Sequence, residues 1–520
     1  MKPGVLFTWP AYRHPDHEAI VFQETRITYD QVNCNINRLA NSLISIGLSK
    51  GQKVAVLMNN CVELVECLLG VPRAGLIVIL LNARQSAKEH LEIMNDCEVD
   101  CLILSSSFET IIEPIISLIP SLKHIIVAGN KYKGQPNTSY SELVSGHPTT
   151  EPSVEVMPDE VLRLQYTSGT TGKPKGTIYS FEMIYNWMTN MIINLDQPIY
   201  PWDVNLNVGP LTHAAGNNFM LYFIKGAKNI ILERFDEERV LWTIQKEKVT
   251  SMLLVPTMIT RLLSHPKLFS YDLSSLRRIW YGTAPISADK LEEAISAFGP
   301  IFRQNYGMTE CPQPITFLSP EEHVIRGTEE QRRRLASAGR PALGVEIKLV
   351  DQDGQVVSKD EIGEVAIRTN KIASGYWKKE ELTAAAFRNG WFFAQDMARM
   401  DSAGYIYIVD RKADMIISGG FNIYPHEVEK ILLEHEAVEE TAVIGVPDEL
   451  WGESVKALVV IREGFTISEQ ELIEFCRNNM TSYKKPKTVE FVTSLPRNTY
   501  GKINRRALRE PYWKGRDRRV

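Results

Sequence analysis

The run from Tyr166 to Gly176 has the residue types that bind an anion. It reads Tyr-Thr-Ser-Gly-Thr-Thr-Gly-Lys-Pro-Lys-Gly. Glycines let backbone N–H groups approach a ligand, hydroxyls add small donors, and lysines supply charge-assisted hydrogen bonds to phosphate oxygens. A flexible surface loop is the alternative, but such loops usually carry Asp, Glu or Asn, which this run lacks. We therefore expect a phosphate-binding loop.

The run does not have the spacing of a Walker phosphate loop. Two residues separate Gly169 from Gly172, where the Walker pattern has four, and Pro174 follows Lys173 where Ser or Thr would stand. A kinase or GTPase is therefore not expected. Residues 161–166 alternate as in a strand, and residues 181–193 have an apolar helical face. The pattern predicts a strand, a phosphate-binding turn and a helix.

The same run resembles the signature loop of the adenylate-forming superfamily, which contains acyl-CoA synthetases, adenylation domains of non-ribosomal peptide synthetases and firefly luciferase. Six further segments match in the order of that family, so the resemblance covers nearly the whole chain. It implies that the loop binds ATP through Thr167, Ser168, Gly169, Thr170, Thr171, Gly172, Lys173 and Lys175.

Residues 304–310 resemble the Tyr-Gly-x-Thr-Glu motif of the family. The resemblance implies that Tyr306 packs on adenine beside Gly307, that Thr309 meets the α-phosphate, and that Glu310 helps to hold Mg²⁺. The residue types agree, because an aromatic ring suits a purine and a carboxylate is a hard oxygen ligand. A strand end with a surface glutamate is the alternative for this motif taken alone.

Three further positions correspond to nucleotide and catalytic residues of the family. Asp396 matches the aspartate that bonds both ribose hydroxyls, and Arg411 matches a second ribose ligand. Lys502 matches the catalytic lysine of adenylation, a mobile charge that bridges carboxylate and α-phosphate. Two departures accompany them, since Gln395 stands where the family usually has glycine and Ala413 where it commonly has Asp or Lys.

The segment from Met415 to Pro425 resembles the acyl-CoA synthetase pattern for thioester formation. Its paired glycines would let the pantetheine arm of CoA pass close to the backbone. The Tyr483–Lys487 cluster could contact the phosphates of CoA, and a solvated lysine turn is an equal alternative for it. The expected CoA-binding residues are Ser418, Gly419, Gly420, Phe421 and Lys484.

Two segments align with those that line the acyl site of the family. His213 would be an aromatic gate near the carboxylate, with a core histidine as the alternative. The aspartate that pairs with the amine in amino-acid-activating members is missing, so we expect a hydrophobic acid without an α-amine. The expected acyl-binding residues are His213, Phe219, Tyr281, Gly282, Thr283 and Ala284.

Composition bounds the partners of the protein. A formal charge of −5 over 520 residues argues against nucleic acid or an anionic membrane as the main partner. The seven cysteines are scattered without metal-binding spacing, which is typical of thiols in a reducing compartment. We find no apolar run long enough for a membrane helix and no signal-peptide pattern. A cytoplasmic protein is expected, and a homodimer is one compatible state.

The order of the segments predicts the architecture. Amphipathic helices alternate with short apolar strands up to about residue 320, residues 338–409 are rich in strands and turns, and an α/β unit of about a hundred residues follows. We expect an α/β fold: a large N-terminal domain of two stacked α/β subdomains with a β-rich subdomain, and a small mobile C-terminal α+β domain. The predicted limits are 1–410 for the adenylating domain and 411–520 for the mobile domain.

These features predict an acid:CoA ligase that forms AMP from ATP, with Mg²⁺ as cofactor and CoA as co-substrate. A first alternative is an enzyme that adenylates an acid and loads it on a carrier protein. A second alternative is a non-catalytic nucleotide-binding protein. Glu310 and Lys502 argue against the second, because binding alone would not need them.

Overall fold

The computed structural model describes residues 2, 4–129, 138–168, 174–498 and 502–514. The chain divides into two compact units. The larger unit comprises Met1–Glu346 and Arg368–Phe392, and the smaller unit comprises Ile347–Ile367 and Phe393–Val520. We describe each unit by itself, and the domain limit expected at residue 410 remains a prediction.

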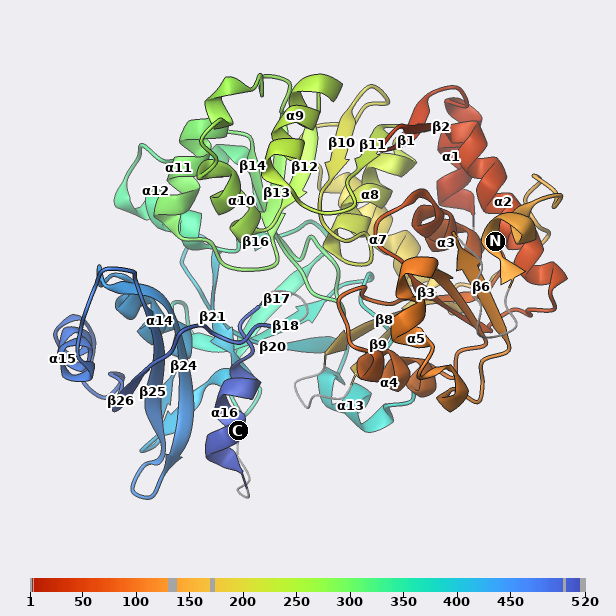
Figure 1. The fold of residues 1–520 in the computed structure, drawn as a ribbon. Helices are drawn as coiled ribbons and strands as arrows, with labels where there is room; N and C mark the ends of the chain where they lie inside the picture. Colours follow the sequence, from red (N-terminus) through yellow and green to blue (C-terminus); the bar gives the residue numbers. More distant parts are fainter. Residues whose placement is uncertain (1, 3, 130–137, 169–173, 499–501, 515–520) are drawn as a thin grey trace. The chain divides into compact units, whose positions relative to one another are not determined.

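A seven-stranded sheet lies in the N-terminal part of the larger unit (Figure 1). The first six strands in sheet order, from β7 at the edge to β8, run parallel. The last strand, β9, runs antiparallel to β8. In sheet order the strands are β7 (Thr138–Ser139), β6 (His124–Ala128), β5 (Cys101–Ser105), β3 (Lys53–Leu57), β4 (Ile77–Leu80), β8 (Val161–Ser168) and β9 (Pro174–Ser180).

A nine-stranded sheet forms the second half of the larger unit. Its central strands are parallel, and antiparallel strands lie at both ends. In sheet order they are β16 (Arg340–Pro341), β15 (Thr316–Leu318), β14 (Phe302–Tyr306), β13 (Arg278–Gly282), β12 (Ser251–Leu254), β10 (Val204–Asn207), β11 (Lys228–Ile231), β1 (Glu18–Phe22) and β2 (Thr25–Thr28).

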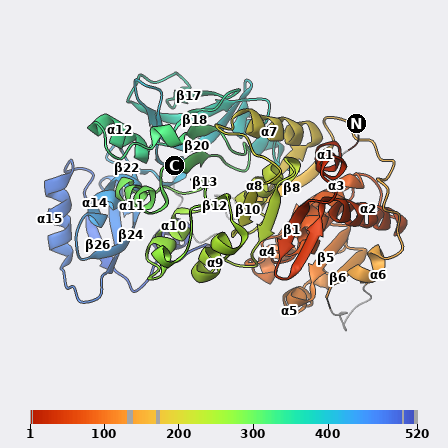
Figure 2. The same cartoon turned by 90° about the horizontal axis from the view of Figure 1, so that it is seen from above.

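Helices fill the space between the two sheets and cover their outer faces (Figure 2). One hydrophobic cluster joins α2, α3, α7 and α8 to strand residues of both sheets, including Val56 and Ile231. The neighbouring residues Leu57 and Ile230 point the other way, into the clusters under α4–α5 and α9–α11. This layering confirms the two stacked α/β subdomains.

The helices of these layers have the following bounds. They are α1 (Val5–Arg13), α2 (Tyr29–Ser45), α3 (Val62–Arg73), α4 (Ala87–Cys97), α5 (Glu109–Ile112), α6 (Tyr140–Val144), α7 (Phe181–Ile193), α8 (Ala214–Ile224), α9 (Glu237–Glu247), α10 (Pro256–Leu263), α11 (Ala288–Phe298), α12 (Glu329–Arg333) and α13 (Glu380–Ala386). Helix α2 shows why such segments form, since Thr28 and Gln31 close a capping box and Val32, Ile36 and Leu39 are buried on one face.

A five-stranded sheet forms the expected β-rich part of the chain. It contains β17 (Glu346–Val350), β18 (Ile362–Arg368), β20 (Trp391–Met400) and β19 (Phe387–Arg388) in that order, with β21 (Ile406–Arg411) paired to β20. A second five-stranded sheet belongs to the smaller unit, with β23 (Phe421–Ile423), β22 (Ile416–Ser418), β25 (Gly452–Ile461), β24 (Val438–Asp448) and β26 (Thr488–Phe491). Helices α14 (Pro425–Leu433), α15 (Glu469–Asn479) and α16 (Arg505–Trp513) accompany it.

The strand-turn-helix prediction for the phosphate loop was incomplete. The strand and helix α7 are present, but β9 lies between them and forms an antiparallel hairpin with β8. The sequence Thr177-Ile178-Tyr179 favours an extended strand, because β-branched and aromatic residues pack well on a pleated surface. Within the described ranges, no helix is both long and apolar enough to span a membrane.

Candidate active site

Strands β8 and β9 hold the two ends of the predicted phosphate loop. Thr167 of β8 is in register with Lys175 of β9. The Thr167 hydroxyl oxygen is buried and has no hydrogen-bond partner among the described residues. Burying an unpaired polar atom costs free energy of folding unless a ligand or a water molecule forms a hydrogen bond with it. The predicted residues Gly169, Thr170, Thr171, Gly172 and Lys173, and the side chain of Ser168, lie outside what the structure describes.

Lys175 forms a compact cluster with Glu310 and Tyr376. Lys175 Nζ lies 3.1 Å from Glu310 Oε1 and 3.1 Å from the Tyr376 hydroxyl oxygen, while that hydroxyl donates to Glu310 Oε1 at 2.7 Å. The ammonium also lies 4.4 Å from the centroid of the Tyr376 ring. Burial, and next the charge of Glu310, raise the pKa of Tyr376, so its hydroxyl remains a donor. Tyr376 was missed from the sequence, where no motif spacing marked it.

Glu310 leaves one oxygen for a cation. Lys175 and Tyr376 both contact Oε1. Among the described residues, no side chain forms a hydrogen bond or ion pair with Oε2. In the same part of the chain, no group of three or more His, Cys, Asp or Glu residues could hold a metal by itself. Mg²⁺ often binds one or two carboxylates together with substrate phosphates. The residues present therefore fit a magnesium ion that arrives with ATP.

The residues before Glu310 form a loop whose backbone leaves little room for a side chain at Gly307. A Cβ atom on Gly307 would lie 2.6 Å from the backbone nitrogen of Gln313. Tyr179 of β9 donates to the Thr309 carbonyl at 2.7 Å, which joins this loop to the phosphate hairpin. Residues 304–309 all retain partial exposure. The hairpin and the motif loop thus lie together in the larger unit.

Two fully buried side chains, Lys371 and Cys311, lie at the segment that follows Glu310. The Lys371 ammonium is fully buried and donates to the carbonyl oxygens of Pro312, at 3.1 Å, and Pro314. Burial lowers the pKa of Lys371 to about 8. Cys311, the residue after Glu310, is also fully buried, and burial raises the pKa of its thiol to about 11.

The predicted acyl-binding residues fall on two faces of the nine-stranded sheet. His213 precedes α8, its Nδ1 lies 2.7 Å from the Thr212 hydroxyl, and burial lowers its pKa to about 4, so the ring is neutral at pH 7. Phe219 of α8 is fully buried and stacks on Phe223. Tyr281 lies on the opposite face, where its hydroxyl is 2.9 Å from Nε2 of His323.

The end of β13 brings the remaining acyl candidates to the edge of the sheet. Thr283 and Ala284 are exposed there, and Thr283 has a φ of 67°, which is rare for a β-branched residue. A Cβ on Gly282 would lie 2.2 Å from the Asn305 carbonyl oxygen, so the close approach of β13 and β14 requires glycine. The acyl role of these residues remains a prediction.

The predicted ribose ligands pair with each other in the smaller unit. Asp396 and Arg411 are cross-strand partners in β20 and β21, and Arg411 Nε lies 2.7 Å from Asp396 Oδ1. Asp396 is buried, whereas half of the Arg411 side chain is exposed. Gln395 has a φ of 58°, so it holds the left-handed conformation that glycine adopts without strain. The departure from the family pattern therefore keeps the turn.

Lys502 interacts electrostatically with this pair. Its side chain retains exposed surface, yet crowding by protein atoms lowers its pKa, the charge of Arg411 lowers it further, and Asp396 opposes both. A hydrogen bond from its backbone N–H to Asn498 Oδ1, at 3.0 Å, fixes the segment. The structure thus brings together Asp396, Arg411 and Lys502.

The segment around Ala413 is held by charges from α16. Arg509 donates to the Ala413 carbonyl at 3.3 Å and to Asp414 Oδ1 at 2.7 Å. Asp410 accepts from the backbone N–H groups of Arg411 and His426, while burial raises its pKa to about 6.

The predicted CoA-binding residues gather at the β22–β23 turn. Gly419 and Gly420 have φ values of 57° and 83°, and a Cβ on Gly419 would lie 2.3 Å from the Trp451 ring. Phe421 is 52% exposed and stacks on Tyr483 with ring centroids 4.6 Å apart. Lys484 pairs with Glu427 at 2.7 Å. These residues form an exposed aromatic and basic surface next to a glycine turn.

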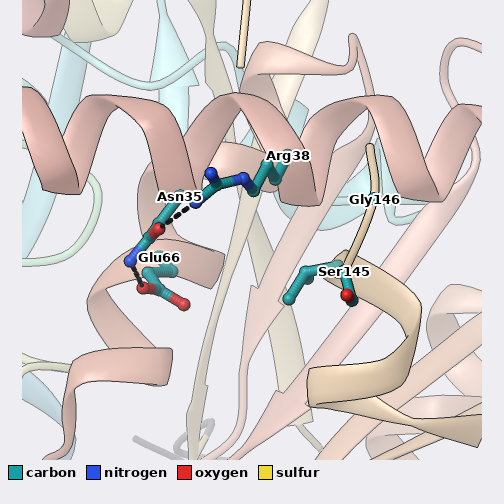
Figure 3. A pocket seen from close by; sticks show the side chains of 6 residues that line it. Asn35, Arg38, Glu66, Ser145 and Gly146 are labelled. Carbon is teal, nitrogen blue, oxygen red and sulfur yellow. Dashed lines mark hydrogen bonds between the residues drawn. The ribbon is translucent and has the colours of Figure 1, made fainter. Parts of the chain in front are cut away.

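A separate pocket of about 280 Å³ opens between α2, α3 and α6 (Figure 3). Asn35 donates to the buried carboxylate of Glu66 at 2.8 Å, and Arg38 donates to Asn35 at 3.1 Å. Tyr140 donates to the other oxygen of Glu66 at 2.6 Å. The pocket contains none of the motif residues, and its carboxylate is satisfied by its neighbours.

Family models match both parts of the chain. Residues 7–377 match the AMP-binding enzyme family, and residues 427–502 match the C-terminal domain of AMP-binding enzymes. The chain belongs to the AMP-binding enzyme family. The resemblance drawn from the sequence motifs is confirmed.

Relatives of this AMP-binding enzyme extend over nearly its whole length. It is 34% identical over 530 residues to the medium/long-chain-fatty-acid–CoA ligase FadD8 of Mycobacterium tuberculosis, covering 99% of this chain and 91% of the relative. The structure of o-succinylbenzoate CoA synthetase MenE from Bacillus subtilis, in complex with the acyl-adenylate intermediate OSB-AMP, is 31% identical with a TM-score of 0.84, and 97% of each chain is covered. The amide bond synthetase McbA from Marinactinospora thermotolerans is 26% identical with a TM-score of 0.87, covering 98% of this chain and 100% of that one.

Proposed function

We propose that this AMP-binding enzyme is a carboxylic acid:CoA ligase. In the first step the acid attacks the α-phosphate of ATP, giving acyl-AMP and pyrophosphate. In the second step the CoA thiol displaces AMP and forms the thioester. The observation that carries the proposal is the cluster of Lys175, Tyr376 and Glu310 beside the phosphate hairpin, because it concentrates charged groups suited to polyphosphate and a cation.

The first step must overcome the repulsion between a carboxylate and a phosphate. At ~4 Å and an effective dielectric of about 20, two unit charges interact by ~4 kcal/mol. We assign Lys175 to the phosphates, Thr309 to the α-phosphate, and Lys502 to the bridge between the reacting groups. Mg²⁺ held at Glu310 would supply positive charge to the phosphate oxygens. Tyr306 and Gly307 would bind adenine, and Asp396 and Arg411 the ribose.

The second step assigns the glycine turn of β22–β23 to CoA. Gly420 leaves the backbone open to the pantetheine arm, whereas Gly419 packs closely on Trp451, and Ser418 lies beside them. Phe421 offers an exposed aromatic surface, and Lys484 a cation for phosphate. Loading of a carrier protein would use the same turn, so the thiol acceptor has to be tested directly.

The proposed acid is hydrophobic: a fatty, aryl or cyclic acid. FadD8 is named for medium- and long-chain fatty acids and MenE for o-succinylbenzoate, which together bracket this range. We also propose a reducing, cytoplasmic location, supported by seven free cysteines of which five are buried. A homodimer is one compatible oligomeric state, which sedimentation can measure.

Pyrophosphate release with ATP and Mg²⁺ tests the proposal. We expect release that depends on one class of acid and turns over only with free CoA. Turnover only with a holo carrier protein would indicate the first alternative. If none of the acids in a broad panel causes pyrophosphate release, the proposal is overturned. Lys502→Ala should slow adenylation by ~10²- to 10³-fold and spare thioester formation from added acyl-AMP. Lys430→Ala, on the exposed face of α14, is the matched lysine control.

A further inference from the structure

Residues 375–379 run along the outer edge of the phosphate hairpin, beside β9. The backbone N–H of Ile178 donates to the Gly375 carbonyl at 3.0 Å. Two residues along the segment, the Trp377 N–H donates to the Gly176 carbonyl at 2.8 Å, and an antiparallel bridge lies between these two bonds. Segment 375–379 therefore continues the seven-stranded sheet past its last strand, within the larger unit.

Side chains of segment 375–379 reach both faces of the hairpin. Tyr376 lies on the face of Lys175, since its hydroxyl is 3.1 Å from Lys175 Nζ and donates to Glu310. Trp377, the next residue, packs against the hydrophobic cluster under α4 and α5 on the other face. Segment 375–379 therefore joins the proposed phosphate and magnesium ligands to the α4 side of the sheet.

Asp96 of α4 connects this segment to the hairpin. Its Oδ1 accepts from the Lys379 ammonium at 2.8 Å, and its Oδ2 accepts from the Tyr166 hydroxyl at 2.7 Å. The Tyr166 side chain is buried, and burial raises the pKa of its hydroxyl, which therefore remains a donor. Helix α4 packs beside β9 (Figure 1). Both oxygens of one carboxylate thus contact the two elements that carry the proposed ATP ligands.

The Tyr166 ring lies directly before the point where the predicted phosphate loop begins. Tyr166 is in register with Gly176, and a Cβ on Gly176 would lie 2.8 Å from the ring. The next pair in the register is Thr167 with Lys175. The two pairs are one residue apart, about 3.3 Å along the strand. A shift of Tyr166 would therefore also displace Thr167 and Lys175.

We propose that Asp96 is a positioning residue for ATP. This inference rests on the proposed function, in which the phosphate hairpin and Glu310 bind ATP and Mg²⁺. Asp96 holds β8 and segment 375–379 at a fixed separation. Because β8 leads into the phosphate loop and segment 375–379 carries Tyr376, the partner of Glu310, the carboxylate keeps the phosphate and cation ligands in register. Asp96 acts through these two contacts, not by touching ATP.

A second ion pair joins the same two elements and provides the matched control. Lys378 pairs with Glu98 at 2.7 Å, one residue before Lys379 and two residues after Asp96. The Glu98 side chain is 59% exposed, against 17% for Asp96. Among the described residues, Glu98 accepts from no side chain of the hairpin, whereas Asp96 accepts from Tyr166. A role limited to tying α4 to segment 375–379 would be shared by both pairs.

Calorimetric titration of ATP with Mg²⁺, without acid or CoA, tests the inference in the full chain. Asp96→Asn keeps the shape of the side chain and removes its charge. We expect the Kd of ATP to rise by about 5- to 50-fold, because loss of the charge-assisted bonds is only partly expressed in binding. Tyr166→Phe should act in the same direction, and the double variant should exceed Asp96→Asn by no more than about twofold. Lys378→Met should stay within about twofold of the wild type.

Steady-state kinetics separate positioning from a general loss of structure. In Asp96→Asn the KM for ATP should rise by the same factor as the Kd, while the KM for the acid stays within about twofold. Lys379→Arg keeps the cation and should bind ATP within about threefold of the wild type. Thermal unfolding of each variant establishes that it is folded before its affinity is read.

Three results would overturn the role of Asp96 and leave the proposed function standing. They are an unchanged ATP affinity in Asp96→Asn, equal losses in Asp96→Asn and Lys378→Met, and a KM for the acid that rises as much as the KM for ATP. The affinity for ATP is measurable even if no acid supports turnover. A wild-type protein that binds no ATP would overturn both the inference and the proposed function.

Discussion

Lys175 Nζ and Glu310 Oε1 lie 3.1 Å apart, so the lysine of the phosphate hairpin is paired with the predicted magnesium ligand. Tyr376 bonds to both. If Lys175 binds phosphate and Glu310 binds Mg²⁺, as proposed, each of these two charges would exchange its present partner for a ligand of opposite charge. The ion pair thus gives each charge a partner when no ligand is bound.

Replacing Lys175 should therefore weaken both the fold and ATP binding. In Lys175→Met the buried Glu310 carboxylate keeps only Tyr376, and we expect unfolding free energy to fall by about 1–3 kcal/mol. ATP should also stabilise the variant less than the wild type in thermal unfolding. Lys378→Met removes an exposed pair with Glu98 and should change stability by no more than about 0.5 kcal/mol. Equal effects of the two substitutions would contradict the role of the Lys175 pair.

Gln395 carries backbone strain that glycine would relieve. Its φ of 58° costs roughly 1–2 kcal/mol for a residue with a Cβ, against about 0.5–1 kcal/mol of extra chain entropy for glycine. We expect Gln395→Gly to raise unfolding free energy by about 0.5 kcal/mol, and Gln395→Ala not to raise it. Denaturant unfolding of the three proteins measures the difference. A less stable glycine variant would show that the Gln395 side chain outweighs the strain.

The pH profile of adenylation should report the environment of Lys502. A lysine acts as a cation only below its folded-state pKa, and crowding by protein atoms and the charge of Arg411 lower that pKa from the usual value near 10.4. The adenylation rate should therefore decrease as pH rises, and this decrease should begin at a lower pH than the pKa of an ordinary lysine would give. Arg411→Gln removes one cause and should move this alkaline limb upward, even if the rate itself is lower. A limb that stays in place in Arg411→Gln would argue that another group sets it.

Lys371 should make the larger unit more stable as pH rises above about 8. Its folded-state pKa is about 8, whereas an unfolded lysine titrates near 10.4. Between these values the unfolded chain binds more protons than the folded one, so unfolding free energy increases with pH. From pH 8 to about 9.5 the gain is about 1.5 kcal/mol. Lys371→Met should lack this rise, and parallel pH profiles for the two proteins would refute the prediction.

The sequence predicted most elements because their signals are local. The helix expected over 181–193 is α7, and the strand expected over 161–166 lies within β8. Strand β9 was missed because Pro174 and Gly176 favour a loop, whereas the pairing with β8 decides the outcome. Helix and strand periodicity cannot report such long-range pairing.

The site was only partly predictable for the same reason. Glu310 and Lys175 stood in motifs, but Tyr376, 66 residues beyond Glu310, reaches it through the fold. The unpaired hydroxyl oxygen of Thr167 is invisible in sequence, because burial and the absence of a described partner are properties of the packed sheet. The faces of β13 likewise decide that Tyr281 and Gly282 lie in different surroundings.

Cys311 gives the proposed chemistry a form of chemical insulation. An acyl-adenylate is a mixed anhydride that can acylate a nearby thiolate, and the residue after Glu310 is itself a thiol. Full burial keeps this thiol protonated, with a pKa of about 11. An acyl-adenylate formed at the proposed site would therefore face a buried, protonated thiol at Cys311 and no nucleophilic thiolate from this residue.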